Sequence, residues 1–234
     1  MKKYIPLLFM VCIINTASVM CAEFSESVFR IKSKIRMLMI NEKKELMLME
    51  GYTIGTAFCI SLPGDKKNLL MTACHNLVYT EPLLNVPVDV ESTEIEIPQA
   101  KGPPIWLPIK VVKKDVKLDI AIIKTEEPVG KMLSFSTKEP EKKDKLVISG
   151  AIRGEPIQEF KAKMDEKFWN GDINSRMETS SFGQGMSGGP VLLNGKVVGI
   201  IVAGIRLNGD AGLNPKIGLF APISVINTFL KDRD

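Results

Sequence analysis

Short runs of apolar and β-branched residues, separated by Gly, Pro, Asn and Asp, follow one another along most of this chain. Such runs are typical of β-strands, and the residues between them are typical of turns. The pattern predicts strands over residues 28–37, 45–49, 55–62, 69–73, 105–113, 119–125, 145–150, 156–164, 189–193, 196–203 and 218–221. Many short strands without intervening helices indicate an all-β sandwich or barrel.

Two connections have the composition of hairpin turns, and only one segment has a helical pattern. Residues 63–68 (PGDKKN) predict a hairpin loop, and the Asn-Gly pair within residues 193–196 predicts a tight turn. Residues 222–231 place apolar side chains at helical spacing, with Ser224 as the expected cap. The sequence therefore predicts a single C-terminal α-helix after the last strand.

The chain divides into a leader and two β-units. Residues 81–106, rich in Pro and acidic residues, predict a long surface excursion, and the Lys- and Glu-rich residues 131–145 predict a linker. We expect one unit over residues 23–135 and a second over residues 136–234, each large enough for a core of its own. No internal repeat is visible.

Residues 1–22 have the pattern of a signal peptide. Lys2 and Lys3 precede a short apolar run, and small residues follow up to Ala22, after which we expect cleavage. The run is short for a membrane span. Cys21 raises the alternative of a lipoprotein anchor, but the residues before it fit a lipobox poorly. We expect a secreted or periplasmic protein without a stable membrane span.

Composition excludes several classes of protein. Hydrophobic residues make up 45% of the chain and charged residues 25%, as in ordinary globular proteins. The net charge is +4, and the basic residues are scattered, which argues against nucleic-acid binding. No Cys or His cluster has metal-ligand spacing, so we expect no metal and no cofactor. Outside the leader only Cys59 and Cys74 remain, as a disulfide or as two buried thiols.

Three separate segments carry residues that suit nucleophilic catalysis. His75, the only histidine, ends the run NLLMTACH; Asp119 begins DIAII; and Ser187 lies within GMSGGP. A serine nucleophile needs a base to take its proton and an acid to orient that base. We therefore expect Ser187 as nucleophile, His75 as general base and acid, and Asp119 as its orienting partner. The backbone N–H groups of Gly185 and Ser187 are the expected oxyanion hole.

Residues 185–189 also match GxSxG, the nucleophile elbow of α/β-hydrolases. Those enzymes place the histidine after the serine in the chain. No histidine follows Ser187, and the surrounding pattern is not β/α. The motif therefore does not indicate an α/β-hydrolase.

At these residues the chain resembles the chymotrypsin/trypsin-like serine proteases, in particular compact bacterial members related to HtrA. GTAFCI (residues 55–60) is similar to the family's GSG-type strand, TACH to TAAH, DIAII to DIALL, and GMSGGPV to GDSGGPV. VGIIVAG (residues 198–204) is similar to the strand that lines the specificity pocket. The resemblance implies two six-stranded antiparallel β-barrels with an active site between them, acting on a protein or peptide substrate.

The chain also departs from the family pattern. Met186 replaces the aspartate that accepts a new N-terminus in animal zymogens, so we expect no activation of that kind. Val202 stands where a serine often supports the catalytic aspartate. No sequence for a PDZ domain follows the final helix.

The resemblance also implies a substrate-binding set, in which Ser181 lies near the pocket floor and glycines form its walls. With no carboxylate at Ser181 to bind Lys or Arg, we expect an apolar or medium-sized P1 side chain. The set comprises Ser181, Phe182, Gln184, Ile201, Val202, Gly204 and Gly218.

The sequence thus predicts an exported serine endopeptidase that acts through an acyl-enzyme. Two alternatives stay open: a protease fold that has lost turnover and binds peptides or a partner, and an esterase with the same three residues. The sequence leaves the natural substrate and the oligomeric state undetermined.

Overall fold

We describe the fold from a computed structural model, which describes residues 24, 26–62, 68–81, 84, 86–99, 101–168, 173–205 and 217–231. The expected signal peptide (residues 1–22) and most of the expected loop at residues 63–68 lie outside the described residues. The described elements are, in order, β1 (Val28–Ile40), β2 (Leu46–Cys59), β3 (Leu69–Thr72), η1 (Cys74–Asn76), β4 (Val78–Glu81), β5 (Val86–Asp89), β6 (Ser92–Ile97), β7 (Ile105–Pro108), β8 (Lys110–Asp115), β9 (Ile120–Lys124), β10 (Lys145–Gly150), β11 (Gln158–Glu166), β12 (Ser175–Thr179), β13 (Pro190–Leu193), β14 (Lys196–Ile205), β15 (Ile217–Pro222) and α1 (Ile223–Lys231).

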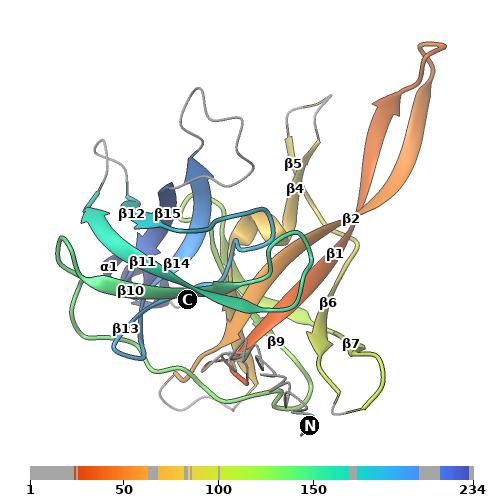
Figure 1. The fold of residues 1–234 in the computed structure, drawn as a ribbon. Coiled ribbons are helices and arrows are strands. Elements are labelled where there is room, and N and C mark those ends of the chain that lie inside the picture. The colour runs from red at the N-terminus through yellow and green to blue at the C-terminus, as the bar shows by residue number, and fades with distance from the viewer. Residues whose placement is uncertain are drawn as a thin grey trace, which may run out of the picture.

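The strands form two β-units, which confirms the expected all-β architecture. The first is a curled seven-stranded sheet in the order β7-β6-β1-β2-β3-β9-β8, and the second is a closed six-stranded barrel in the order β10-β11-β12-β15-β14-β13. A separate hairpin, β4-β5, lies beside the first sheet (Figure 1). Every strand pair within the two units is antiparallel.

One apolar core joins the two units. Phe58 and Met71 of the first sheet share a buried cluster with Leu192 and Ile200 of the barrel and with Phe229 of α1. Each unit also has a core of its own, one around Ile31 and Leu70 and one around Ile148 and Phe220. The units are therefore packed on each other through side chains that water does not reach, which fixes the loops at their junction.

Helix α1 confirms the expected C-terminal helix, but its N-terminus is capped differently. Ser224 lies within the first turn, and its N–H donates to Oε1 of Glu139 at 2.8 Å. A carboxylate at this end satisfies an N–H that has no partner within the helix and complements the helix dipole.

Three expectations on the strands were wrong. The run at 105–113 is not one strand but divides into β7 and β8, which pair with β6 and β9 respectively. The runs at 45–49 and 55–62 belong to one strand, β2, because Gly51 pairs directly with Ile35 of β1 and does not interrupt the ladder. The region 81–106 is not only a surface excursion, since β6 lies in it, pairs with β1 and buries Ile95 completely. Its acidic residues alternate with apolar ones, and a half-buried strand has that pattern.

Candidate active site

His75 and Asp119 are brought together by the ends of two paired strands. The pairing of β3 with β9 ends at Thr72 and Ala121. The residues just beyond this pair in each segment are therefore neighbours in space. Asp119 Oδ2 lies 2.7 Å from Nδ1 of His75, and Oδ1 accepts the backbone N–H of His75 at 2.8 Å. One carboxylate thus holds both the ring and the backbone of the histidine. This arrangement favours a proton on Nδ1 and leaves Nε2 as the basic nitrogen.

The backbone of Asp119 is held as firmly as its side chain. Its φ angle is 55°, in the left-handed region, where Asp and Asn are the commonest residues after glycine. Its carbonyl oxygen accepts the N–H of Cys74 at 3.1 Å. Three hydrogen bonds therefore join Asp119 to residues 74 and 75.

Ser187 is attached to the histidine segment through its backbone. Its carbonyl oxygen accepts the N–H of Thr56 and Nδ2 of Asn76, each at 2.9 Å. Asn76 is the next residue after His75, so a hydrogen bond joins the segment of the candidate nucleophile directly to that of the candidate base. Among the described residues, the Ser187 hydroxyl and the imidazole form no hydrogen bond with each other.

Thr56 fixes the loop that precedes Ser187. Its hydroxyl donates to the carbonyl oxygen of Gly185 at 2.7 Å and accepts the N–H of Ala151 at 3.1 Å. The glycines here allow this close approach. Gly185 has φ 99° and a Cβ on it would lie 2.3 Å from the carbonyl oxygen of Ala151; Gly188 has φ 86° and a Cβ on it would lie 2.2 Å from that of Thr56. Larger residues cannot occupy either position without moving the backbone.

The peptide between Gln184 and Gly185 has a defined orientation. The carbonyl oxygen of Gln184 accepts the N–H of Arg153 at 2.7 Å. In a trans peptide the N–H points opposite to the C=O, so the Gly185 N–H points away from Arg153. Within the described chain, neither this N–H nor that of Ser187 has a hydrogen-bond acceptor.

The expected substrate-binding residues lie around the β14–β15 pair. Gly204 and Gly218 are cross-strand partners, and a Cβ on Gly218 would lie 3.0 Å from the ring of Phe182. Phe182 is 4% exposed, and Ser181 is half-buried. The Phe182 ring therefore occupies the space beside Gly218 that a larger residue there would fill.

The remaining members of that set differ in accessibility. Gln184 is exposed at the edge of the loop. Ile201 has no exposed surface and Val202 only 6%. Their side chains therefore cannot contact a substrate directly and can only support the residues that do. Val202 lies in the core that joins the two units.

Neither of the two described cysteines forms a disulfide bond, and both lie in the core. Cys59 and Cys74 belong to the buried cluster of the first sheet. Burial raises the pKa of the Cys59 thiol to about 12, because a thiolate there would lose its hydration. No group of three metal-ligating side chains gathers anywhere in the described ranges, and no helix within them is long and apolar enough to cross a membrane.

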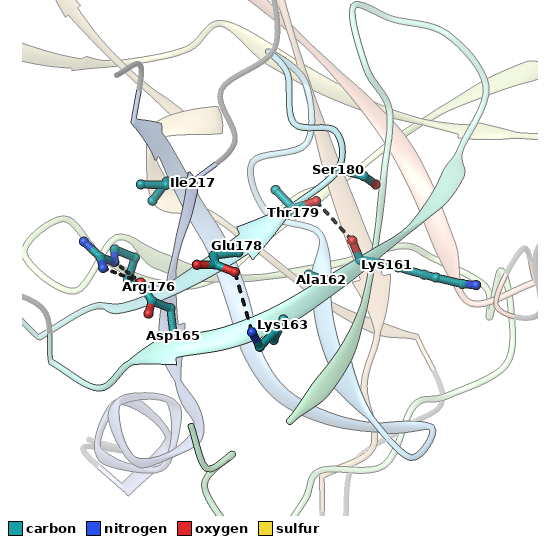
Figure 2. A pocket seen from close by; sticks show the side chains of 9 residues that line it. All are labelled: Lys161, Ala162, Lys163, Asp165, Arg176, Glu178, Thr179, Ser180 and Ile217. Carbon is teal, nitrogen blue, oxygen red and sulfur yellow. Dashed lines mark hydrogen bonds and ion pairs between the residues drawn. The ribbon is translucent and has the colours of Figure 1, made fainter. Parts of the chain in front are cut away.

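A hollow of about 560 Å³ lies elsewhere, on the outside of the barrel over β11 and β12 (Figure 2). Four of the five charged side chains that line it form two pairs: Arg176 binds Asp165, and Lys163 Nζ lies 3.8 Å from Oε2 of Glu178. None of the candidate catalytic residues lines it. Because most of its charged side chains already pair with one another, we assign it no role.

Comparison with known proteins shows the family of this chain. Residues 55–200, which include His75, Asp119 and Ser187, match the family model described as a trypsin-like peptidase domain. The chain belongs to the trypsin-like peptidases. It is a serine endopeptidase of the chymotrypsin-like fold, as the sequence predicts. No curated protein matches it by sequence.

Solved structures show the same fold for this peptidase. The active form of the Rv3671c protease from M. tuberculosis has 18% sequence identity over 88% of this chain and 80% of the other, with a TM-score of 0.62. Its inactive form has 20% identity over 88% of both chains, with a TM-score of 0.61.

Sequence reasoning on this peptidase missed Thr56 and Asn76. Thr56 belongs to the GTAFCI segment and Asn76 follows TACH, but their side chains form hydrogen bonds with residues more than a hundred positions away. A local pattern contains no signal for such contacts.

Proposed function

We propose that this peptidase cleaves peptide bonds through a triad of Ser187, His75 and Asp119. The observation that supports it best is the two-point contact of Asp119 with His75, combined with the Asn76 bond to the carbonyl of Ser187. The carboxylate orients the imidazole with Nε2 free, and Asn76 holds the serine segment beside it. Hydrogen bonds between a nucleophile and its base are often loose without substrate and tighten in the complex.

The reaction then has two halves. Ser187 Oγ attacks the scissile carbonyl carbon while His75 Nε2 takes the hydroxyl proton; the imidazolium returns that proton to the leaving amine as the C–N bond breaks. Water, activated by the same nitrogen, attacks the acyl-enzyme and releases the acid. Asp119 stabilises the imidazolium in both halves. The free N–H groups of Gly185 and Ser187 receive the developing oxyanion, and one such donor contributes about 3 kcal/mol to the rate.

The residues near Gly218 support a preference for an apolar P1 side chain of small or medium size. On the Gly218 side of the β14–β15 pair, the end of Met177 and the ring of Phe182 lie 2.7 and 3.0 Å from where a Cβ on Gly218 would be, so this side has little room for a large P1 side chain. Ser181 offers no charge to bind Lys or Arg. Cleavage of a peptide library mainly after Lys, Arg or Glu would contradict this preference.

We also propose that the protein is exported, on the basis of the signal-peptide pattern of residues 1–22. The N-terminal residue of the protein recovered from a cell fractionation tests this. A cytoplasmic chain that retains Met1 would contradict it.

Active-site labelling tests the triad directly. A fluorophosphonate probe should modify the protein once, at Ser187, and the Ser187→Ala variant should not react. His75→Ala should fold and react at least a hundredfold more slowly, because the hydroxyl loses its base. A folded, unreactive wild-type protein would favour the alternative of a peptidase fold that only binds peptides. Comparing amide with ester turnover separates the peptidase from an esterase.

A further inference from the structure

Strands β1 and β2 extend beyond the first sheet as a two-stranded arm that leaves the body of the molecule (Figure 1). Their ladder continues without a register shift to the pair of Ile40 with Leu46. Within the described chain, β6 accompanies β1 only as far as Lys34, and β3 accompanies β2 only over Ala57–Cys59. The outer part of the arm therefore stands apart from both β-units.

The arm ends in a well-built turn. The backbone N–H of Asn41 donates to the carbonyl of Glu45 at 3.0 Å, and Oδ1 of Asn41 accepts the N–H groups of Lys43 and Glu45, each at 2.9 Å. Lys44 takes the left-handed conformation, with φ 63°. These bonds fix the geometry in which the two strands present their side chains.

The register separates the apolar residues of the arm into two faces. Cross-strand partners share a face, and successive residues alternate between faces. One face consists of methionines and the other of leucine and isoleucine. The methionine face comprises Met37, Met39, Met47 and Met49, and the leucine face comprises Leu38, Ile40, Leu46 and Leu48.

The leucine face is the more exposed of the two. Leu46, Leu48 and Ile40 are 67%, 60% and 55% exposed, whereas the exposed methionines reach 43–47%. Together the leucine-face side chains offer an apolar surface on the order of 400 Å². A two-stranded hairpin is marginally stable in water by itself, and an apolar surface of this size on a monomer usually marks an interaction site.

Charged clusters border the leucine face at both of its ends. At the base, Lys34 and Arg36 pair with Glu50 and Glu91, with Lys34 Nζ 3.0 Å from Glu50. At the tip the turn contains two acidic and two basic residues, Glu42, Lys43, Lys44 and Glu45. An apolar centre with a polar rim is the usual anatomy of a protein interface.

This arrangement is complementary to itself. When two arms stack antiparallel across a two-fold axis, the leucine faces meet, and the charged tip of each arm lies over the charged base of the other. Both clusters contain two positive and two negative residues, so neither repels its counterpart. The two faces together bury about 800 Å², which suits a weak dimer better than an obligate one.

The same features disfavour a lipid surface. The charged turn would have to cross the headgroups before any apolar residue entered the bilayer, and its four charges cancel, so anionic lipid does not attract it.

We propose that the leucine face of the arm is a self-association surface, on which the arm of a second copy docks to form a two-fold symmetric dimer. The dimer does not depend on the chemistry of Ser187, so the Ser187→Ala variant associates as the wild type does.

Sedimentation velocity on the processed protein, expressed from the full chain, tests the dimer over about 1–200 µM. We expect a monomer that converts to a dimer with a dissociation constant in the micromolar range. Leu46→Glu combined with Leu48→Glu should weaken association at least tenfold, because the charges become buried in the interface. Met47→Glu with Met49→Glu is the matched control, with the same charges on the same strand and the opposite face, and should associate like the wild type.

Circular dichroism confirms that each variant is folded. A wild-type protein that stays monomeric at 200 µM would overturn the proposal. So would a dimer that the leucine-face variant leaves intact, or one that the methionine-face variant disrupts more strongly. A monomer whose arm binds phosphatidylglycerol vesicles would assign the surface to lipid and overturn the proposal as well.

Discussion

The side-chain amide of Asn76 donates from Nδ2 to the carbonyl oxygen of Ser187 at 2.9 Å and to Oγ1 of Thr72 at 3.0 Å. Asn76 follows His75 directly, and its own backbone carbonyl accepts the hydroxyl of Ser33 at 2.7 Å. A 4% exposed amide thus connects the end of β3, strand β1 and the segment of Ser187. This side chain, together with the Thr56 N–H that also binds the carbonyl of Ser187, fixes the segment of the candidate nucleophile beside that of the candidate base.

Gly55→Ala should disturb that connection. A Cβ at residue 55 would lie 2.4 Å from the amide of Asn76, which is buried and held by two hydrogen bonds. We expect a loss of 1–3 kcal/mol in unfolding free energy, about that of overpacking a core, and a reduced kcat. Denaturant unfolding and steady-state kinetics measure the two effects.

Gly51→Ala is the control for that substitution. It lies on the same strand, and its Cβ would be 3.4 Å from the flexible end of Met37. We expect nearly unchanged activity. Equal kinetic losses in both variants would contradict the role given to Asn76.

Asp119→Asn should remove activity and leave the fold intact. Asn tolerates a φ of 55° as Asp does and has nearly the same shape. Its amide cannot accept both bonds that the carboxylate accepts from His75, and it does not stabilise imidazolium. We expect kcat to fall by about 10⁴ with a thermal midpoint close to that of the wild type. A fall of less than tenfold would exclude Asp119 as the orienting acid.

Thr56→Val should lower kcat in addition to stability. Valine has the shape of threonine without the hydroxyl that holds the carbonyl of Gly185. The loop before Ser187 then loses the hydrogen bond to the carbonyl of Gly185, and the expected oxyanion donors are less well ordered. We therefore expect kcat to fall about 10–100-fold at similar KM.

Thr125→Val is its matched control. Thr125 is buried and donates its hydroxyl to the carbonyl of Glu127 at 2.6 Å, in the first β-unit at the end of β9. Thr56→Val loses the two hydrogen bonds of its hydroxyl, and Thr125→Val loses the bond to Glu127; each lost bond costs about 1–3 kcal/mol. Only the Thr56 variant should lose kcat; equal kinetics would contradict a positioning role.

Phe182→Leu should widen the range of P1 side chains. The smaller side chain vacates space beside Gly218 and costs less stability than truncation to alanine. We expect kcat/KM to rise for Phe or Leu at P1 relative to Ala, as a peptide library can measure. An unchanged profile would assign Phe182 to the core alone.

The Cys59 thiol should be inert in the native protein. Its pKa of about 12 leaves a thiolate fraction of about 10⁻⁴ at pH 8. Iodoacetamide should therefore label Cys59 only after denaturation, and labelling should begin in the native state only as pH approaches the raised pKa. A protein in which Cys59 and Cys74 stay unlabelled even when denatured without reductant would contradict two free thiols.

The sequence predicts the β-class, the final helix and the family from local patterns, because alternating strands and glycine-rich catalytic segments are encoded by neighbouring residues. It does not predict that β6 completes the first sheet, since Pro and acidic residues around Ile95 suggest a loop until the pairing with β1 is known. Phe182 remains ambiguous for a related reason, as its environment depends on how Gly204 and Gly218 pair. The side-chain bonds of Thr56 and Asn76 depend on the packing of one β-unit against the other.

The β1–β2 ladder has no register shift, so a change in the length of the arm affects the body end and the tip of β2 differently. Thr56 pairs with Arg30, in the part of β2 that belongs to the first sheet. Removing one residue from each strand of the arm would therefore leave the position of Thr56 unchanged. At the far end, however, that deletion would turn the methionines to where the leucines now point, since neighbouring side chains alternate. Only insertions or deletions of an even number of residues per strand keep the methionines and the leucines on their present faces. Homologues with functional arms should therefore differ in arm length by an even number of residues per strand.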